Sequence, residues 1–279
     1  MALSITSLNS GSNGNCYYVG NDTEAVLVDV GLTCRETEKR MRILGLSMQK
    51  VKAIFISHEH GDHIKGLTVI AEKYSLPVYI TNATCTSGRI QLRQELVNEF
   101  TANLPINIGA LAVTAFSKFH DAADPHSFVI SSNGITVGVF TDIGSPCDRL
   151  IKYFSQCHAA FLEANYDDNL LENGRYPVFL KNRIRGGHGH LSNKQALDVF
   201  VKHKPSFMSH LLLAHLSKDN NSPELAKQLF QNKSNGTEII IASRYEQTPV
   251  YLIKNVDRLN ANIRPAKIEV FIPRQLSLF

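Results

Sequence analysis

The sequence predicts an α/β fold in which two packed mixed sheets are flanked by helices. Short apolar segments that favour β-strands occur in both halves of the chain, and segments of helical character lie between them. This interleaving favours sheets packed face to face with helices on the outside. A chain of 279 residues with 43% hydrophobic content can bury a large core, and one compact enzyme domain is the simplest organisation.

Nine short strands and four helices are expected along the chain. The strands cover residues 3–8, 16–19, 25–29, 53–57, 78–81, 112–116, 127–131, 136–140 and 159–163. The helices cover residues 33–44, 62–74, 192–204 and 223–230. Thr33, Ser192 and Ser222 are suitable N-cap residues. Gly45 would end the first helix, and Pro223 suits the first turn of the last one.

The densest group of metal-binding side chains follows the expected strand at residues 53–57. Residues 58–63 contain three histidines and two carboxylates, and both side-chain types are ligands of zinc and similar ions. His58 and His60 can reach one ion through their ring nitrogens. Asp62 and His63 follow a glycine and can turn toward a second ion. Four ligand-type residues at this spacing argue against a set of ordinary surface histidines.

This group resembles the motif HxHxDH of the metallo-β-lactamase superfamily, here formed by His58, His60, Asp62 and His63. The other motifs of that family have matches in the same order along the chain, at Asp29, His120, Asp142 and His215. The resemblance implies the metallo-β-lactamase αββα sandwich.

The same resemblance implies a centre with two divalent metal ions. One ion would be held by His58, His60 and His120, and the other by Asp62, His63 and His215. Asp142 would lie between the two ions, and Asp29 would support the ligands. Mixed histidine and aspartate ligands accept zinc, manganese or iron.

Longer strings resemble a narrower group. Residues 9–16, 120–122, 189–193 and 215–221 are similar to the bacterial WalJ/YycJ group, a branch of the superfamily associated with exonuclease activity on DNA. This resemblance implies an exonuclease that digests single- or double-stranded DNA from 5′ to 3′. It also implies a role in DNA repair, such as mismatch repair.

Hydrolysis of a phosphodiester is the chemistry that this ligand set favours. Two ions that share Asp142 would also share a water and lower its pKa, so that a bridging hydroxide acts as the nucleophile. The ions can also neutralise charge on the oxygens of a phosphate. The candidate catalytic residues are Asp62, His190 and Glu163.

His190 is the candidate that would protonate the leaving alkoxide. Its surroundings, Gly-His-Leu-Ser, resemble a Gly-His-Ser/Thr element of related phosphodiesterases, in which the histidine lies beside the scissile phosphate. Glu163, at the end of an expected strand, would orient His190. A structural capping role is the alternative for His190.

Two segments are candidates for phosphate binding: Ser10, Ser12 and Asn13 in the first, and Lys181, Arg183 and Arg185 in the second. The first is a glycine-containing loop whose backbone N–H groups could surround a phosphate, although a tight hairpin turn would have the same composition. The second is expected to be a basic loop, which the resemblance places near the mouth of the site. An ordinary solvated loop is the alternative, because three cations are few.

The chain is expected to consist of a large domain and a short C-terminal segment with different roles. Residues 1–263 would form the hydrolase domain, and residues 264–279 a C-terminal strand and tail. Gln275, Leu276, Leu278 and Phe279 resemble the bacterial sliding-clamp-binding motif, with the Leu-Phe pair as apolar anchors. Binding to the clamp would tether the enzyme to DNA. The alternative is that the tail packs on its own domain.

Composition bounds the location and the rival functions. The chain has no bilayer-length apolar run, no signal-peptide pattern and five cysteines without a close pair, so we expect a cytoplasmic protein without a membrane partner. A net charge of +4 is too small to identify a nucleic-acid partner. An RNA-processing nuclease stays possible. A small-molecule phosphodiesterase or an acyl hydrolase, such as a lactonase or thioesterase, would share the metal ligands, but the basic segment and the tail argue against both.

Overall fold

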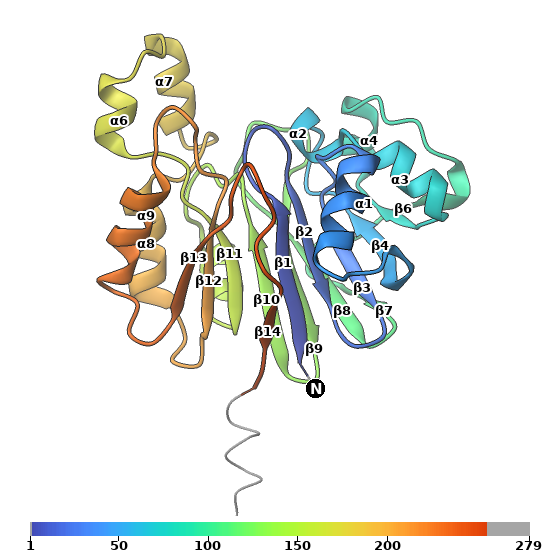
Figure 1. Cartoon of the computed structure of the whole chain (residues 1–279). Helices are drawn as coiled ribbons and strands as arrows, with labels where there is room; N and C mark the ends of the chain where they lie inside the picture. The colour runs from blue at the N-terminus through green and yellow to red at the C-terminus, as the bar shows by residue number, and fades with distance from the viewer. Residues whose placement is uncertain (1, 256–279) are drawn as a thin grey trace, which may run out of the picture.

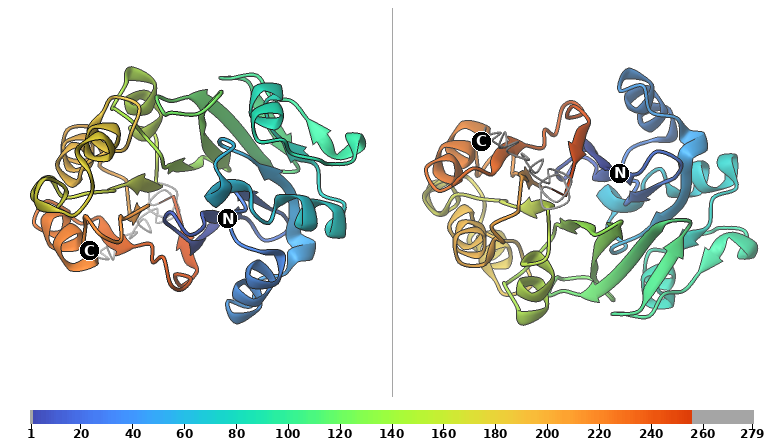
Figure 2. Two further views of the ribbon diagram at one scale, coloured as in Figure 1. Left: turned by 90° about the horizontal axis from the view of Figure 1, so that it is seen from above. Right: turned by 90° about the horizontal axis from the view of Figure 1, so that it is seen from below.

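The computed structural model describes residues 2–255, which form two seven-stranded sheets with helices on their outer faces (Figure 1). Views from above and below show the same layers, with the helices at the periphery (Figure 2). The predicted arrangement of two mixed sheets flanked by helices is confirmed. The expected C-terminal strand and tail, residues 264–279, lie outside the described residues.

The first sheet has the order β14-β1-β2-β3-β4-β5-β6. Its strands are β1 (Leu3–Asn9), β2 (Cys16–Gly20), β3 (Ala25–Val28), β4 (Val51–Phe55), β5 (Val78–Tyr79), β6 (Val97–Asn98) and β14 (Tyr251–Ile253). The strands from β14 to β3 pair antiparallel, and those from β3 to β6 pair parallel. The sheet is therefore mixed.

The second sheet has the order β13-β12-β11-β10-β9-β8-β7. Its strands are β7 (Pro105–Ile108), β8 (Leu111–Ser117), β9 (His126–Ser132), β10 (Ile135–Phe140), β11 (Ala159–Glu163), β12 (His210–Ala214) and β13 (Glu238–Ile241). The strands from β7 to β10 pair antiparallel, and those from β10 to β13 pair parallel. Five observed strands, β6, β7, β12, β13 and β14, were not among those expected from the sequence.

Nine α-helices lie among residues 2–255: α1 (Cys34–Ile43), α2 (Gly61–Ile64), α3 (Leu67–Tyr74), α4 (Asn82–Ser87), α5 (Asp148–Phe154), α6 (Asp168–Asn173), α7 (Val178–Arg185), α8 (Asn193–His203) and α9 (Pro223–Gln231). Short 3-10 turns occupy η1 (Met48–Lys50) and η2 (Gln94–Leu96). None of the helices in this part of the chain is long and apolar enough to cross a membrane.

Three apolar layers hold the fold together. The central layer fills the space between the sheets, where the ring of Tyr17 on β2 lies 4.9 Å from that of Phe161 on β11. A second layer joins the outer face of the second sheet to α5, α8 and α9, and a third joins the first sheet to α1 and α3. Burial of these side chains is the main force that fixes the two sheets against each other.

Three predicted helix starts are confirmed by their caps. The side chain of Thr33 accepts a hydrogen bond from the Glu36 N–H at the start of α1. Ser192 caps α8 in a capping box with Gln195. Ser222 accepts from the Leu225 N–H at the start of α9. Sequence-local chemistry therefore determines where these helices begin.

The predicted single helix at residues 62–74 is wrong, because the structure divides it into α2 and α3. The division lies at Gly66, whose N–H donates to the Val30 carbonyl oxygen. A Cβ atom at Gly66 would lie 2.0 Å from the carbonyl oxygen of Leu32. The close approach of this backbone to the segment after β3 therefore requires glycine and separates the two helices.

Gly66→Ala is expected to lower the free energy of unfolding by about 1–3 kcal/mol, because the backbone after β3 must move to admit the methyl group. Urea denaturation measures this change. Gly61→Ala is the matched control, since nothing lies within 4 Å of an added Cβ at that position. Equal stability of the Gly66 variant and the wild type would contradict the prediction.

Candidate metal centre

The seven candidate metal ligands meet where strands of both sheets end. The segment after β4 supplies four of them: His58, His60, Asp62 and His63. The segments after β8, β10 and β12 supply His120, Asp142 and His215. The carboxyl ends of strands are the usual place for a site in sheets of this kind. The structure thus brings together side chains that are far apart in the sequence.

Two groups of possible ligands lie side by side. In the first, ring nitrogens of His58, His60 and His120 lie within 4.8 Å of one another. In the second, a carboxylate oxygen of Asp62 and ring nitrogens of His63 and His215 lie within the same distance of one another. These are the two sets expected from the sequence.

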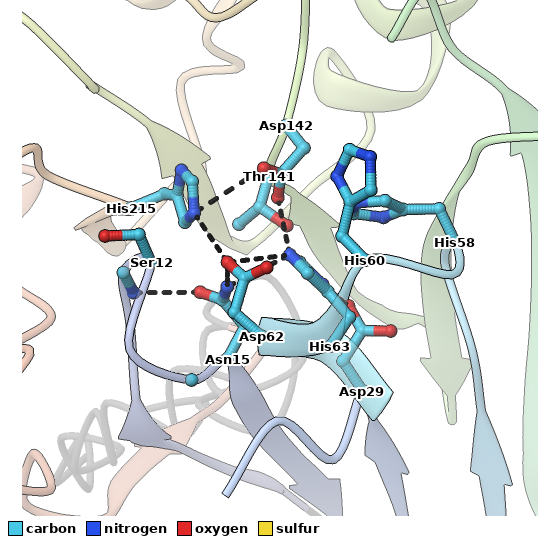
Figure 3. A network of polar contacts seen from close by, with 12 residues as sticks. Ser12, Asn15, Asp29, His58, His60, Asp62, His63, Thr141, Asp142 and His215 are labelled. Atoms are coloured by element: carbon cyan, nitrogen blue, oxygen red, sulfur yellow. Dashed lines mark hydrogen bonds and ion pairs between the residues drawn. The ribbon is translucent and has the colours of Figure 1, made fainter. Parts of the chain in front are cut away.

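Asp142 lies between the two groups (Figure 3). Its Oδ1 is 3.8 Å from Nε2 of His120 and 3.5 Å from Nε2 of His215. Its Oδ2 is 3.2 Å from Nε2 of His63. One carboxylate therefore faces ligands of both groups, as a residue shared by two ions would.

Unsatisfied polar atoms test whether metal ions fit here. Nε2 of His120, Nε2 of His215 and Oδ2 of Asp142 are buried without a hydrogen-bond partner among residues 2–255. The His63 ring, although 3.2 Å from Oδ2 of Asp142, does not meet hydrogen-bond geometry. Each such atom costs about 1–3 kcal/mol when buried alone. A divalent cation accepts electron pairs from all three atoms, so the donor set fits metal ions.

Nearby groups bind the other nitrogen of several ligand histidines. Asp29 Oδ2 lies 2.7 Å from Nδ1 of His63, and Ser57 Oγ lies 2.8 Å from Nδ1 of His58. The carbonyl oxygen of Gly189 lies 3.1 Å from Nδ1 of His120. Because each contact occupies Nδ1, it directs Nε2 toward the centre.

Asp29 also connects the first sheet to the loop that carries the motif. Its carboxylate accepts hydrogen bonds from the N–H and from the hydroxyl of Ser57, both at 2.8 Å. Asp29 is fully buried, so these bonds are not exchanged with water. Asp29 therefore contacts both Ser57 and His63, as expected of a residue that supports the ligands.

Ser57, Asn15 and Asn165 support the site but were not selected from the sequence. The amide of Asn15 donates to Asp62 Oδ2 at 3.1 Å and lies 3.0 Å from Nε2 of His63. Asn165 Nδ2 donates to the carbonyl oxygen of His215 at 2.8 Å. Ser57 directly precedes the motif and Asn15 lies in one of the longer family-like strings, so both could have been selected from the sequence as site residues. Asn165 could not.

Three residues of the site leave their strands in the left-handed backbone region. The φ angles are 59° at Asp29, 54° at Asp142 and 56° at His215. Non-glycine residues adopt this region at a cost of about 1–3 kcal/mol and persist there when surrounding contacts hold them. At these turns the side chains point into the candidate metal centre (Figure 3).

The pKa values reflect a concentration of buried negative charge. Burial raises the pKa of Asp62, but His63 and His215 outweigh that effect and lower it to about 2. Burial lowers the pKa of His63, whereas Asp142, Asp29 and Asp62 raise it to about 10. A proton on His63 thus supplies positive charge that a metal ion would otherwise supply. Metal binding must displace that proton and should weaken as the pH falls.

His190 and Glu163 lie at the edge of the second group. Nδ1 of His190 is 2.8 Å from Glu163 Oε1, and the His190 side chain is 21% exposed. Ser192, rather than His190, caps the following helix. His190 therefore faces solvent beside the centre, where a substrate could reach it.

Glu163 itself is fully buried, so it can affect a substrate only through the residues that it contacts. Its Oε2 accepts the N–H groups of Ile143 and Leu191, and its Oε1 lies 3.1 Å from Nδ1 of His215. Burial raises its pKa, but the charge of His190 and the hydrogen bonds with His190 and His215 lower it to about 2. Glu163 is placed as a positioning residue for both histidines.

The loop of residues 10–15 supports the centre and also forms part of its rim. The Ser10 hydroxyl accepts the His215 N–H at 2.7 Å and contacts the Tyr17 hydroxyl at 2.8 Å, so it is already occupied inside the protein. Ser12 and Asn13 are exposed. Of the three candidate phosphate-binding residues in this loop, only Ser12 and Asn13 are therefore accessible to a substrate.

The expectation that Lys181, Arg183 and Arg185 lie in a loop is wrong, because they belong to helix α7. The eight residues of α7 contain neither glycine nor proline, and the glycine-rich stretch begins after them. Arg183 Nε lies 2.5 Å from Asp121, the neighbour of His120. Arg185 pairs with Glu172 at 2.6 Å, and Lys181 donates to the Glu172 carbonyl oxygen. Of these three cations, only Arg183 contacts a residue that is next to a candidate metal ligand.

Comparison with known proteins agrees with this fold. A family model described as "Beta-lactamase superfamily domain" matches residues 24–215. Exodeoxyribonuclease YycJ of Bacillus anthracis is 37% identical over 232 residues, which cover 81% of this chain and 87% of that protein. Exodeoxyribonuclease WalJ of Streptococcus pneumoniae is 30% identical over 233 residues, covering 81% and 86%.

Solved structures confirm the predicted metallo-β-lactamase fold. The metallo-beta-lactamase fold protein YhfI from Bacillus subtilis aligns with a TM-score of 0.69 at 19% identity. The alignment covers 90% of this chain and 100% of that one. At this identity the likeness concerns the fold alone.

Asp29→Asn is expected to lower metal affinity by about 10–100-fold, because the His63 ring loses the carboxylate that orients it. Competition with a chromophoric chelator measures the affinity. Asp22→Asn, at an exposed position in a turn, is the matched control. An unchanged affinity in a folded Asp29→Asn variant would contradict the supporting role of Asp29.

Proposed function

This chain belongs to the Beta-lactamase superfamily domain family, and from that membership we propose that it is an exonuclease that acts on DNA. The fold and the relatives make it a metal-dependent hydrolase. The observation that carries the proposal is the seven-residue cluster around Asp142, found in a chain 37% identical to an exodeoxyribonuclease.

Two ions are proposed, held by the two groups of ligands on either side of Asp142. His58, His60 and His120 would hold one, and Asp62, His63 and His215 the other. When bound, such ions lower the pKa of water and offset the negative charge of a phosphodiester. Zinc, manganese and iron all suit these ligands.

The protein's own residues then orient the substrate and move a proton. The Glu163 carboxylate fixes the His190 ring through Nδ1, which leaves the other ring nitrogen to protonate the leaving 3′ oxygen. Asn15 and Asp29 hold Asp62 and His63 in place during this step. The chemistry requires accurate placement of these groups, which burial and hydrogen bonding provide.

The direction and the biological role are further parts of the proposal. Digestion from 5′ to 3′ in mismatch repair agrees with the WalJ/YycJ-like strings of the sequence. Single- and double-stranded DNA are both proposed as substrates. The terminal motif with Gln275, Leu276, Leu278 and Phe279 is proposed to bind the bacterial sliding clamp, which would concentrate the enzyme on DNA.

The purified protein, loaded with zinc or manganese, is expected to release mononucleotides from the 5′ end of labelled DNA. Asp142→Asn should abolish release because it removes a charge shared by both ligand groups, and Asp22→Asn should retain it. End-labelled single- and double-stranded DNA and matched RNA are compared by product analysis. Digestion of RNA but not DNA would favour the RNA-processing alternative, and intact polymers under every metal would contradict a nuclease.

His190→Gln is expected to lower kcat on DNA by about 10²–10⁴-fold, because the leaving alkoxide then lacks a proton donor. A p-nitrophenyl ester of thymidine 5′-monophosphate has a leaving group that needs no proton, so its hydrolysis should fall far less. His188→Gln, on the same loop, is the control. Equal losses on both substrates would remove His190 from the role of acid.

Removal of residues 275–279 is expected to weaken binding to the sliding clamp about tenfold or more, because the apolar anchors are lost. The double variant Leu278→Ala/Phe279→Ala should show the same loss, and Ser277→Ala should bind as the full chain does. Fluorescence anisotropy with labelled clamp measures these affinities. Equal binding by the truncated and full chains would refute the clamp interaction.

A further inference from the structure

A cavity of about 350 Å³ lies beside the candidate metal centre, where β12 and β13 end and α9 begins. Ser10 and Leu216 form part of its wall. The Ser10 hydroxyl accepts the N–H of His215, and Leu216 is the next residue of the chain. The cavity therefore shares its wall with the metal centre.

The cavity combines charged, hydroxyl and apolar groups. Lys218 and Arg244 supply positive charge, Glu246 supplies one carboxylate, and Ser217 and Ser243 supply hydroxyls. Leu216, Pro223, Ile241 and Ala242 supply an apolar wall. A mostly apolar cleft with a few placed polar groups is typical of small-molecule sites, and its volume lies at the lower end of their range of about 300–1,000 Å³.

Arg244 makes hydrogen bonds with residues of the 10–15 loop, but one nitrogen of its guanidinium has no hydrogen-bond partner among residues 2–255. Its backbone oxygen accepts a hydrogen bond from the Asn13 side chain at 2.7 Å. Its Nη2 donates to Ser12 Oγ across a long 3.4 Å, and its Nη1 is buried without a partner among residues 2–255. A guanidinium with free donors matches the geometry of a phosphate.

The cations of this cavity differ from those of α7. Arg183 and Arg185 are each paired with a carboxylate. Neither Arg244 nor Lys218 forms such an ion pair within the described part of the chain. Beside them the Tyr245 ring is 71% exposed, with the Arg244 guanidinium 5.9 Å from its centroid. Exposed aromatic rings are surfaces on which nucleobases stack.

We propose that this cavity binds the terminal nucleotide of the DNA strand, with a phosphate at Arg244 and Lys218. The base would lie against the apolar wall. Its volume admits one nucleotide, and Ser10 and Leu216 join its wall to the segment that carries His215. Occupation would therefore place the adjoining phosphodiester near the metal centre and make cleavage depend on a strand end. The inference rests on the proposed nuclease function.

Binding of thymidine 5′-monophosphate to the full chain tests the proposal without catalysis. Titration in the presence of a chelator prevents metal ions from holding the phosphate. Arg244→Gln and Lys218→Gln are each expected to weaken binding at least ~10-fold, since a charge-assisted phosphate contact is lost. Lys218 is exposed, so its replacement does not endanger the fold. Arg42→Gln, exposed on α1, is the matched control and should bind as the wild type does.

Thymidine and inorganic phosphate serve as separate probes, and both should bind more weakly than the nucleotide. Absence of nucleotide binding, equal affinity in the Arg244 variant, or equal affinity for phosphate and nucleotide would overturn the proposal.

In parallel, Arg244→Gln should raise KM for linear DNA. A wild type that cleaves DNA but binds no nucleotide would refute nucleotide binding in the cavity and leave the proposed nuclease function intact. Arg244-dependent nucleotide binding without any nuclease activity refutes the proposed function and leaves a nucleotide site.

Discussion

Charge that must be compensated inside the protein is the constraint on which this structure depends. Asp29, Asp142 and Glu163 are buried, and Asp62 is largely so. Buried carboxylates are costly unless cations or hydrogen-bond donors surround them. Histidines and backbone N–H groups meet part of this need, and the unsatisfied atoms around Asp142 mark where further positive charge fits.

Packing of the two sheets is what assembles the centre. The first sheet and its loops carry Asp29 and the residues of the HxHxDH motif, whereas the second carries His120, Asp142 and His215. Each of the two groups of possible ligands therefore draws residues from both sheets. Apolar burial between the sheets therefore supports the chemistry directly, because a shift of one sheet would separate Asp142 from the histidines that it faces.

The sequence was informative where chemistry is local and less so where it depends on distant contacts. The spacing of residues 58–63 and the caps at Thr33, Ser192 and Ser222 could be recognised directly. The break at Gly66 could not, because it results from contact with the chain after β3. Glu163 was expected to orient His190, but its contact with His215 arises from the pairing of β11 with β12. The ion pairs that engage the cations of α7 also join residues distant in sequence.

Anomalous diffraction from crystals grown with manganese or zinc tests the central claim most directly. The account predicts two peaks, one beside His58, His60 and His120 and one beside Asp62, His63 and His215, with the Asp142 carboxylate between them. Absence of any peak near Asp142, or metal bound only elsewhere on the molecule, would contradict it.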